Sequence, residues 1–308
     1  MLGLNEIQQR ILREVADLHT VPIGAYNIRA NGRSVGRQST ENIEITPKTD
    51  VSGLEIRIKP GTKNESVHIP VVLSESGLSE VVYNDFYIGE GADVVIVAGC
   101  GIDNCGSHDS RHDGIHRFFV GKNAKVKYVE KHYGSGSGSG KRILNPVTEV
   151  YIEEGGSAEM EMVQIEGVDD TQRTTKAELD SGAKLTVRER LMTHAHQHAV
   201  SAYKVALNGN GSSADVVSRS VAKDDSYQKF DATLYGNAVC RGHSECDSII
   251  MDNGRILAVP ALEANCVDAE LVHEAAIGKI AGEQIIKLMT LGLTEKEAEE
   301  QIINGFLQ

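Results

Sequence analysis

The sequence predicts a mainly β protein whose core is a β-helix (β-solenoid), with a helix before it and a small helical subdomain after it. Two observations predict the core. Apolar and polar residues alternate in short segments between about residues 41 and 265, a period typical of half-buried β-strands. Gly-containing turns precede many of these segments and recur roughly every 27 to 34 residues, a spacing in the range of repeat architectures. The periodicity alone leaves a β-sandwich open as the alternative.

The chain begins with apolar residues at a helical period. Between residues 4 and 18 they form one stripe with polar residues opposite, which predicts an amphipathic helix: Leu4, Ile7, Ile11, Leu12, Val15 and Leu18. Residues 20–40 are polar and contain glycine, so we expect a linker or surface loop there. These two parts define an N-terminal helical segment and linker at residues 1–40, followed by the β-helix core at residues 41–265.

The β-helix core contains segments with clear alternation and one run that interrupts the pattern. Four of the expected strands are at residues 55–58, 125–129, 159–163 and 184–188. The alternating glycine and serine residues at 134–140 are low-complexity sequence, so we expect a flexible loop. This loop does not fit a phosphate-binding motif, because Lys141 is followed by Arg142 where that motif has serine or threonine.

The alternation ends near the C-terminus, and the remaining sequence favours helices. Residues 281–291 carry apolar residues on one face, and Gly292 is a typical helix stop. Thr294 and Glu297 form a capping box that begins a second helix. Two short helices bury little surface between themselves. This C-terminal helical domain, residues 266–308, must therefore pack on the β core or on another protein.

The composition excludes several classes of protein. With 31 basic and 44 acidic residues the chain carries a net charge of −13, which argues against contacts with nucleic-acid phosphates. Its longest apolar stretch, around residues 94–98, is far shorter than the roughly 20 residues that span a bilayer. The first residues lack the basic and apolar pattern of a secretory signal. We therefore expect a cytoplasmic protein whose five cysteines are reduced.

Thiol, imidazole and carboxylate side chains occur together in the last quarter of the sequence. Cys246 precedes His273 by 27 residues, and Glu274 follows directly. That separation is about one repeat, so the thiol and the imidazole could face each other on neighbouring turns. Thiolate and neutral imidazole suit iron, zinc and iron–sulfur clusters. The alternative is a buried cysteine that packs as a small apolar residue, with an ordinary surface histidine.

A second group of possible metal ligands lies near residue 100. Cys100 and Cys105 are separated by four residues, and three histidines follow at a four-residue period: His108, His112 and His116. The spacing matches no standard zinc motif and no complete iron–sulfur motif. We expect the three histidines to share a face only in a helix, which the neighbouring glycines disfavour. Metal binding by Cys100, Cys105 and His108 and a tight loop with core cysteines both remain open.

Three further histidines alternate with other residues: His194, His196 and His198. If this segment is a strand, all three point to one face, a geometry that zinc could use. We favour the plainer interpretation, which is a solvated outer face of the solenoid.

The last quarter of the sequence resembles the C-terminal core of the SufB/SufD family, the scaffold components of the SUF machinery for iron–sulfur cluster assembly. The runs that carry the resemblance are Gly-His-Ser-Glu-Cys-Asp-Ser at 242–248 and His-Glu-Ala at 273–275, and it extends more weakly back to about residue 71. Two positions depart from the family pattern. Glu245 stands in place of a glutamine, and Val272 in place of an acidic residue.

The resemblance implies a right-handed β-helix that acts as a scaffold for iron–sulfur cluster assembly and transfer, and not as an enzyme. It implies that Cys246, His273 and Glu274 hold a transient cluster, in a short undifferentiated form that acts as a homodimer. The implied partners are a SufC-like ABC-type ATPase and apo iron–sulfur client proteins. The resemblance places ATPase docking on the C-terminal helices, and the candidate contact residues are Ile285, Leu288, Met289 and Phe306.

Two other functions remain open. A metal-dependent enzyme on a β-helix could use the group at residues 100–116, although an aromatic content of 5% without tryptophan serves sugar binding poorly. A plain interaction protein with incidental thiols would bind the ATPase but not iron.

Overall fold

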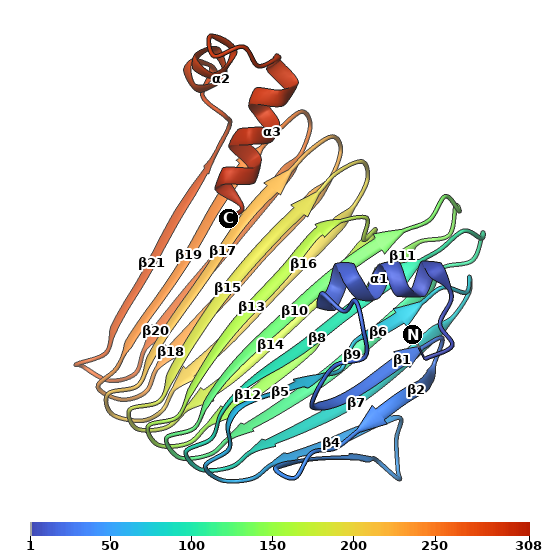
Figure 1. Cartoon of the computed structure of the whole chain (residues 1–308). Helices are drawn as coiled ribbons and strands as arrows, with labels where there is room; N and C mark the ends of the chain where they lie inside the picture. The colour runs from blue at the N-terminus through green and yellow to red at the C-terminus, as the bar shows by residue number, and fades with distance from the viewer. Residues whose placement is uncertain (1) are drawn as a thin grey trace.

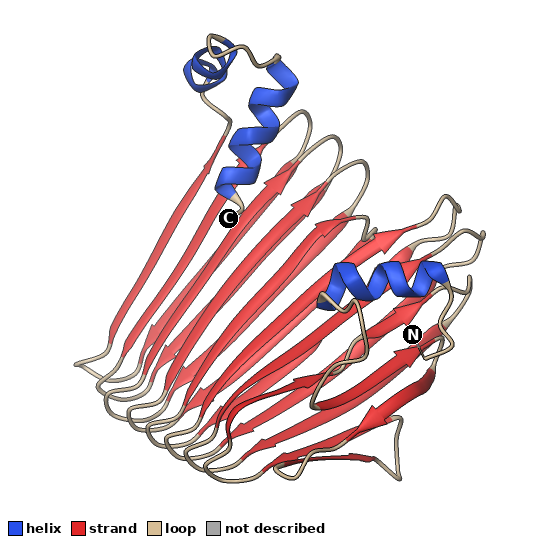
Figure 2. Cartoon of the chain, in the orientation of Figure 1, coloured by secondary structure: helices blue, strands red, loops and turns tan. Residues whose placement is uncertain are grey.

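In a computed structural model, which describes residues 2–308, the chain forms a β-solenoid of about eight turns (Figure 1). One helix lies near the N-terminus and two lie at the C-terminal end (Figure 2). Along most of the solenoid, consecutive strands alternate between two sheets. The predicted mainly β solenoid with flanking helices is confirmed, in place of the β-sandwich alternative.

We call the two sheets sheet A and sheet B. Sheet A contains β1 (Ala25–Ala30), β2 (Arg33–Gln38), β5 (Lys63–His68), β6 (Val71–Leu73), β8 (Asp93–Asp103), β10 (Lys125–Ser135), β13 (Ser157–Glu166), β15 (Lys184–Thr193), β17 (Ser213–Ala222), β19 (Arg241–Ile250) and β21 (Glu270–Gly278). Sheet B contains β3 (Ile43–Pro47), β4 (Gly53–Ile58), β7 (Ser79–Ile88), β9 (Ser110–Val120), β11 (Arg142–Leu144), β12 (Val147–Ile152), β14 (Asp170–Leu179), β16 (His198–Leu207), β18 (Tyr227–Gly236) and β20 (Arg255–Ala264).

Strands pair in parallel with the strand one turn away, and the inner row of sheet A shows the register. Val126 pairs with Ala158, Ala158 with Leu185, and Leu185 with Ala214. All four side chains are buried. These pairings join residues between 27 and 32 positions apart, which confirms the predicted repeat spacing.

The turns that precede successive strands of sheet A have a residue with left-handed backbone at the same place. These residues, with φ between 55° and 74°, are Gly91, Asn123, Gly155, Gly182 and Gly211. Hydrogen bonds join the turns: the N–H of Gly155 donates to Ser181 O and that of Gly182 to Asn210 O, both at 2.9 Å. Glycine and asparagine adopt this conformation at little cost, which explains the periodic glycines of the sequence.

Two segments differ from the expected secondary structure. Residues 25–38 form a hairpin where a linker or surface loop was expected, because β1 and β2 pair antiparallel across a turn at Asn31 and Gly32. Asn-Gly with two positive φ values is the preferred sequence of a tight hairpin turn. At the other end, β21 adds a strand to sheet A within residues 266–308, so that segment is not purely helical.

The glycine–serine run at residues 134–140 packs against the loop at residues 104–108 of the preceding turn. The N–H of Gly138 donates to Asn104 O, and the N–H of Gly140 donates to Gly106 O, each at 3.0 Å. A Cβ atom on Gly138 would lie 2.2 Å from Gly106 O, so this contact needs a residue without a side chain. The run is held by backbone hydrogen bonds, which corrects the expectation of a flexible loop.

The predicted N-terminal helix is confirmed as α1 (Glu6–Ala16), which lies on the outer face of sheet A (Figure 1). Ile11, Leu12 and Val15 of its apolar stripe are buried there, whereas Ile7 is exposed. Two glycines of β8 permit the close approach. A Cβ atom on Gly99 would lie 2.2 Å from Val15 O, and one on Gly101 would lie 2.1 Å from the Ile11 side chain.

The predicted C-terminal helices are confirmed as α2 (Gly282–Met289) and α3 (Glu295–Phe306), and the capping box at the start of α3 is present. α3 packs on the outer face of sheet A, with Ile303 and Leu307 against Val221 of β17. Phe306 lies partly buried in the same cluster. α2 has no buried residue. None of the helices in residues 2–308 is long and apolar enough to cross a membrane.

Candidate metal and thiol sites

The last turn of the solenoid, formed by β20 and β21, is an open end. Within residues 2–308 each of these strands pairs with a neighbour on one side only, so no further turn covers the interior there. Leu262 and Ile277 face inward and are still 42% and 41% exposed. Apolar side chains at such an end are suited to contact with another protein.

Cys246 lies on the inner face of β19, next to the open end. Its side chain is buried, and its Sγ lies 3.6 Å from Oγ of Ser248. Burial raises the pKa of this thiol to about 11, so it is protonated at neutral pH. A metal ion would have to displace that proton, because the thiolate is the ligand form.

His273 faces inward from β21, the last strand of sheet A. Its Nδ1 lies 2.7 Å from Oγ of Ser244, its register partner on β19. Burial lowers the pKa of this imidazole, which favours the neutral form that binds metals. Cys246 pairs with Ala275, two residues further along β21. Cys246 and His273 are therefore diagonal neighbours on one face, a position that places backbones about 7–8 Å apart in β-sheets.

Glu274 points to the opposite face from His273, because successive residues of a strand alternate. On the outer face it meets its register partner Glu245 and also His243. One ligand atom from each of these three side chains lies within 4.8 Å of the other two. His243 also donates a hydrogen bond from Nδ1–H to Oδ1 of Asp215, at 2.8 Å.

The structure therefore divides the predicted ligand set of Cys246, His273 and Glu274 between two faces of sheet A. The thiol and the imidazole lie inside, and the carboxylate lies outside. The sequence analysis did not assign His243 or Glu245 as ligands. The available signal was that Glu245 lies one repeat before Glu274 and two residues after His243, which places all three on one face.

Cys100 lies on the inner face of β8, in contact with histidines that are far from it in the sequence. Its register partner on β10 is His132, and His112 approaches from β9. Burial raises the pKa of the Cys100 thiol, but these two imidazoles overcome the effect and lower it to about 7. Burial likewise opposes a charge on His112. Cys100 and Glu80, whose Oε1 lies 3.1 Å from Nδ1, raise its pKa to about 10.

We expect the contribution of His112 to stability to decrease as pH rises. Because its folded pKa exceeds the ordinary value of 6.5, its charge stabilises the fold fully below about pH 6.5. That stabilisation is lost as pH rises through about 10. Urea unfolding measures the free energy of unfolding of wild type and of His112→Gln. The difference between the two should therefore become smaller as the pH is raised from 6.5 to 10. A difference that grows with pH would contradict the assignment, and the exposed His108→Gln variant is the control.

Cys105 and His108 do not share a site with Cys100. Both lie in the loop after β8, where Cys105 is exposed and its Sγ lies 3.3 Å from Oδ1 of Asp103. Within residues 2–308, Cys100, Cys105 and His108 do not bring three ligand atoms within 4.8 Å of one another. The alternation of the strand and the loop that follows it separate them, so the predicted metal site of these three residues is not formed.

His112 and His116 share the inner face of β9, since residues four apart also lie on one face of a strand. The expectation that only a helix would align them is wrong. Nδ1 of His116 lies 2.9 Å from the hydroxyl of Tyr128, and burial lowers the pKa of His116 to about 4. This imidazole is therefore neutral and takes part in the packing of the core.

Between Cys100 and Cys246 the interior contains a buried charge network. Arg173 of β14 pairs with Glu130 of β10 and lies 3.6 Å from Glu189 of β15. All three side chains are at most 5% exposed. The hydroxyls of Ser201 and Ser218 donate to Glu189 at 2.5 and 2.7 Å. Every carboxylate in the network thus has the partners that a buried charge requires.

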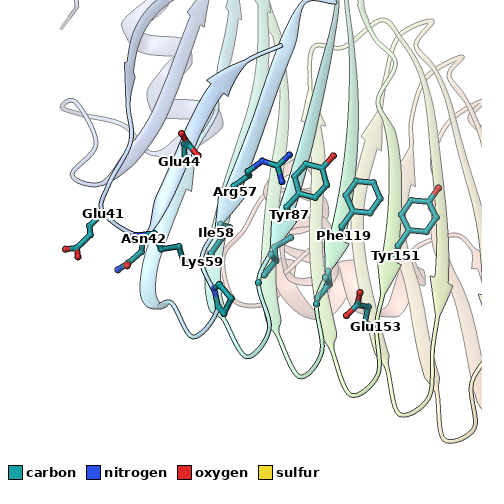
Figure 3. A pocket seen from close by; sticks show the side chains of 15 residues that line it. Glu41, Asn42, Glu44, Arg57, Ile58, Lys59, Tyr87, Phe119, Tyr151 and Glu153 are labelled. Carbon is teal, nitrogen blue, oxygen red and sulfur yellow. The ribbon is translucent and has the colours of Figure 1, made fainter. Parts of the chain in front are cut away.

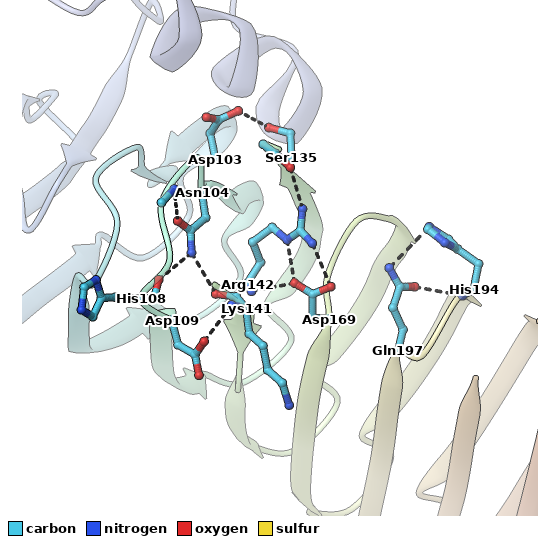
Figure 4. A network of polar contacts seen from close by, with 12 residues as sticks. Asp103, Asn104, His108, Asp109, Ser135, Lys141, Arg142, Asp169, His194 and Gln197 are labelled. Carbon is cyan, nitrogen blue, oxygen red and sulfur yellow. Dashed lines mark hydrogen bonds and ion pairs between the residues drawn. The ribbon is translucent and has the colours of Figure 1, made fainter. Parts of the chain in front are cut away.

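The three histidines near residue 196 do not share a strand face. His194 and His196 lie in the turn between β15 and β16, and His198 is the first residue of β16. The backbone N–H of His194 donates to Oε1 of Gln197 at 2.9 Å (Figure 4). The imidazole of His198 stacks on Tyr227 with ring centroids 5.2 Å apart. The metal-binding alternative, which needed all three histidines on one strand face, is therefore not supported, and His196 and His198 are exposed to solvent as the favoured interpretation expects.

A cavity of about 540 Å³ lies on the outer face of sheet B, beside a row of aromatic rings (Figure 3). Tyr87, Phe119 and Tyr151 stack with centroids 4.9 and 5.3 Å apart and planes within 11°. The guanidinium of Arg57 lies 4.3 Å above Tyr87. The faces of these rings are covered because the rings stack on one another. The row therefore does not offer the exposed flat ring surface that sugar binding needs.

Together these features define a class of protein, a β-solenoid with thiol, imidazole and carboxylate side chains beside an open last turn. The family model described as SUF system FeS cluster assembly, SufBD core domain, matches residues 76–306. The chain therefore belongs to the SufBD family, and its role is in iron–sulfur cluster assembly.

Individual relatives agree with the family match. The chain is 32% identical over 279 residues to an iron-sulfur cluster assembly SufBD family protein of Archaeoglobus fulgidus, covering 88% of this chain and 72% of that protein. It is 28% identical over 262 residues to one of Methanothermobacter thermautotrophicus, covering 84% of this chain and 63% of that protein. A third, of Methanocaldococcus jannaschii, is 27% identical over 284 residues, covering 89% and 87%. The chain thus spans just under two thirds of the second relative and more of the other two.

Proposed function

We propose that the chain is a scaffold on which iron–sulfur clusters form before transfer to apo-proteins, and that it is not itself an enzyme. The observation that carries this proposal is the position of His273 on the inner face of the open last turn, with Cys246 on the same face of the adjacent strand β19. Thiolate and imidazole are ligands of iron–sulfur clusters. A site with few protein ligands suits a cluster that must leave again, and the expected location is the cytoplasm.

One chain supplies an incomplete ligand set for such a cluster. Clusters are commonly held by four side chains, and Cys246 and His273 are two. Two copies joined at their open ends would supply four ligands. Glu274, on the outer face, would add a carboxylate at the rim of that junction. We therefore propose a homodimer with the nascent cluster between its subunits.

We also propose that α2 is the docking element for a SufC-like ABC-type ATPase. Met289 of α2 is 43% exposed, and its neighbour Ile286, which the sequence analysis did not select, is 62% exposed. Ile285 and Leu288 are half-buried. Phe306 is directed into the cluster under α3, so we no longer include it in the docking surface.

If α2 is the docking element, Ile286→Asp with Met289→Asp should abolish capture of the ATPase, because two charges would be buried in the interface. Both side chains are exposed, so the melting temperature should change little. Co-purification of the ATPase is the measurement, with Gln284→Asp on the same helix as the control. Normal capture by the double variant would exclude α2 as the docking element.

The scaffold proposal is tested by anaerobic reconstitution with ferrous iron and sulfide, followed by absorption and Mössbauer spectroscopy. We expect Cys246→Ser to lower cluster retention at least about tenfold, because a direct ligand is lost. Cys105→Ser should retain the cluster, since that exposed thiol lies in a different loop. Retention in Cys246→Ser with loss in Cys100→Ser would move the site to the thiol beside His112. The absence of a cluster in wild type would favour a plain interaction protein.

A metal-dependent enzyme that uses residues 100–116 is the weaker candidate. Cys100, His112 and His116 are at most 4% exposed inside the solenoid, and a substrate would have to enter the core to reach them. Cys105 and His108 lie outside in the loop and are not grouped with them.

A further inference from the structure

A second cavity, of about 510 Å³, lies on the outer face of sheet A beside the end of α3. Side chains of both charges line it. Arg190 and Arg219 lie on β15 and β17, and His243 and Glu245 lie on β19. None of these four residues has a role in the cluster site proposed above.

The two arginines lack the partners that surface arginines usually have. Arg190 and Arg219 are register partners on adjacent strands, an arrangement of like charges that destabilises a sheet. Neither forms an ion pair within residues 2–308, and the Nε of Arg190 is buried without a hydrogen-bond acceptor. A buried donor left without an acceptor costs free energy. These two guanidinium groups are placed to bind an anion.

Three other acidic residues at the cavity do not neutralise these arginines, because each already has partners: Glu189 lies beside Arg173 and accepts from two serines in the core. Glu161 accepts from Lys127 at 2.7 Å, and Asp215 accepts from Arg188 at 2.5 Å. Glu245 forms no ion pair within residues 2–308.

The imidazole and carboxylates provide the other half of a site. One ligand atom each from His243, Glu245 and Glu274 lies within 4.8 Å of the other two. One nitrogen and two carboxylate oxygens suit a divalent first-row transition metal ion. Three protein ligands leave coordination positions open for a further group. Because His243 and Glu245 also line the cavity, those positions would face Arg190 and Arg219.

We propose that this cavity binds a divalent transition metal ion together with a small oxyanion. His243, Glu245 and Glu274 hold the metal ion. Arg190 and Arg219 hold a carboxylate, phosphate or sulfate group that completes its coordination. The site shares only Glu274 with the proposed scaffold function and stands if that function fails.

The test is anaerobic titration of the full chain with Co²⁺, read by visible absorption, which reports the ligand type. A thiolate ligand adds intense charge-transfer absorption in the near ultraviolet, and nitrogen and oxygen ligands do not. In Cys246→Ser, which lacks the thiol of the proposed cluster site, we expect Co²⁺ to bind without that absorption at the site formed by His243, Glu245 and Glu274. Glu245→Gln and His243→Ala should each weaken binding at least about tenfold. Glu245→Gln is nearly isosteric, so it controls for misfolding, and circular dichroism checks both variants.

The oxyanion half is tested by repeating the titration with sulfate or malonate against chloride, at equal ionic strength and equal free Co²⁺. We expect the better of the two anions to tighten Co²⁺ binding about fivefold or more, the range of coupling between neighbouring sites. Arg190→Gln with Arg219→Gln should abolish this gain and leave binding of Co²⁺ in chloride unchanged. The proposal is overturned if Glu245→Gln binds Co²⁺ like wild type, if Co²⁺ binding is lost in Cys246→Ser, or if neither anion changes the affinity.

Discussion

Replacing Arg173 by leucine is expected to lower the free energy of unfolding by about 3–5 kcal/mol, the cost of removing one partner from a buried ion pair. Arg173 is 4% exposed and is the cation that Glu130 and Glu189 share inside the solenoid. Burial alone would raise the pKa of Glu130, and the guanidinium holds it well below its usual range. Without Arg173, Glu189 would remain in the core with no counter-charge, and Glu130 would keep only His132, whose Nε2 lies 3.6 Å away.

The loss of free energy of unfolding in Arg173→Leu should also increase as the pH rises. In wild type the lowered pKa of Glu130 gives stability above the ordinary carboxyl range that is lost as pH falls. In Arg173→Leu, burial would raise that pKa, so the folded state would bind more protons than the unfolded chain. Stability of the variant should therefore fall as pH rises from 5 to 8, over roughly the range where a buried carboxyl titrates.

Urea unfolding followed by circular dichroism at several pH values measures both effects. Lys127→Leu is the matched control, because it removes an exposed cation from two carboxylates on the outer face and should cost less than about 1 kcal/mol. Replacing Arg173, Glu130 and Glu189 together by apolar residues should recover much of the loss, since no charge is then buried alone. An Arg173→Leu variant within 1 kcal/mol of wild type would show that the network is not a source of stability.

The solenoid could be predicted because each repeat has the same turn residues and the same alternation of apolar and polar residues, and both can be seen in short stretches of sequence. Each turn needs a left-handed residue, so Gly155, Gly182 and Gly211 recur at the same place. Each strand alternates because one face is buried. The hairpin at residues 25–38 was missed although Asn31 and Gly32 are a strong turn signal, because the flanking residues are polar and both faces of β2 are at least partly exposed.

The sites were harder to predict, because the stacking of solenoid turns brings residues into contact that are far apart in the sequence and belong to no common local pattern. Cys100 meets His132 one turn later and His112 across the corner, and not Cys105 in the loop that follows it. The steps between turns vary from 27 to 32 residues, so register cannot be counted from a fixed period. The alternation of β19 and β21 does follow from sequence. Applied strictly, it would have separated Cys246 from Glu274 and joined Glu274 to Glu245.

Replacing Leu262 and Ile277 by lysine should convert the proposed homodimer into monomers. Both side chains face inward on the last turn and are about 40% exposed, because no further strand covers them. The edges of β20 and β21 also carry backbone groups that a second copy could pair with in a symmetric antiparallel junction. Four lysines facing one another across that junction would repel and would lose their water, so the expected effect is complete dissociation at micromolar concentration.

The measurement is molar mass by light scattering during gel filtration. Val95→Lys is the matched control, because that valine is 38% exposed on the outer face of sheet A, away from the open end. It should remain a dimer with an unchanged elution volume. A wild type that is monomeric, or a double lysine variant that stays dimeric, would place the contact elsewhere.

Dissociation should also remove cluster retention while Cys246 is still present, because one chain offers only the thiol of Cys246 and the imidazole of His273 on the inner face at its open end. Loss of both properties together would tie the cluster to the junction between two open ends.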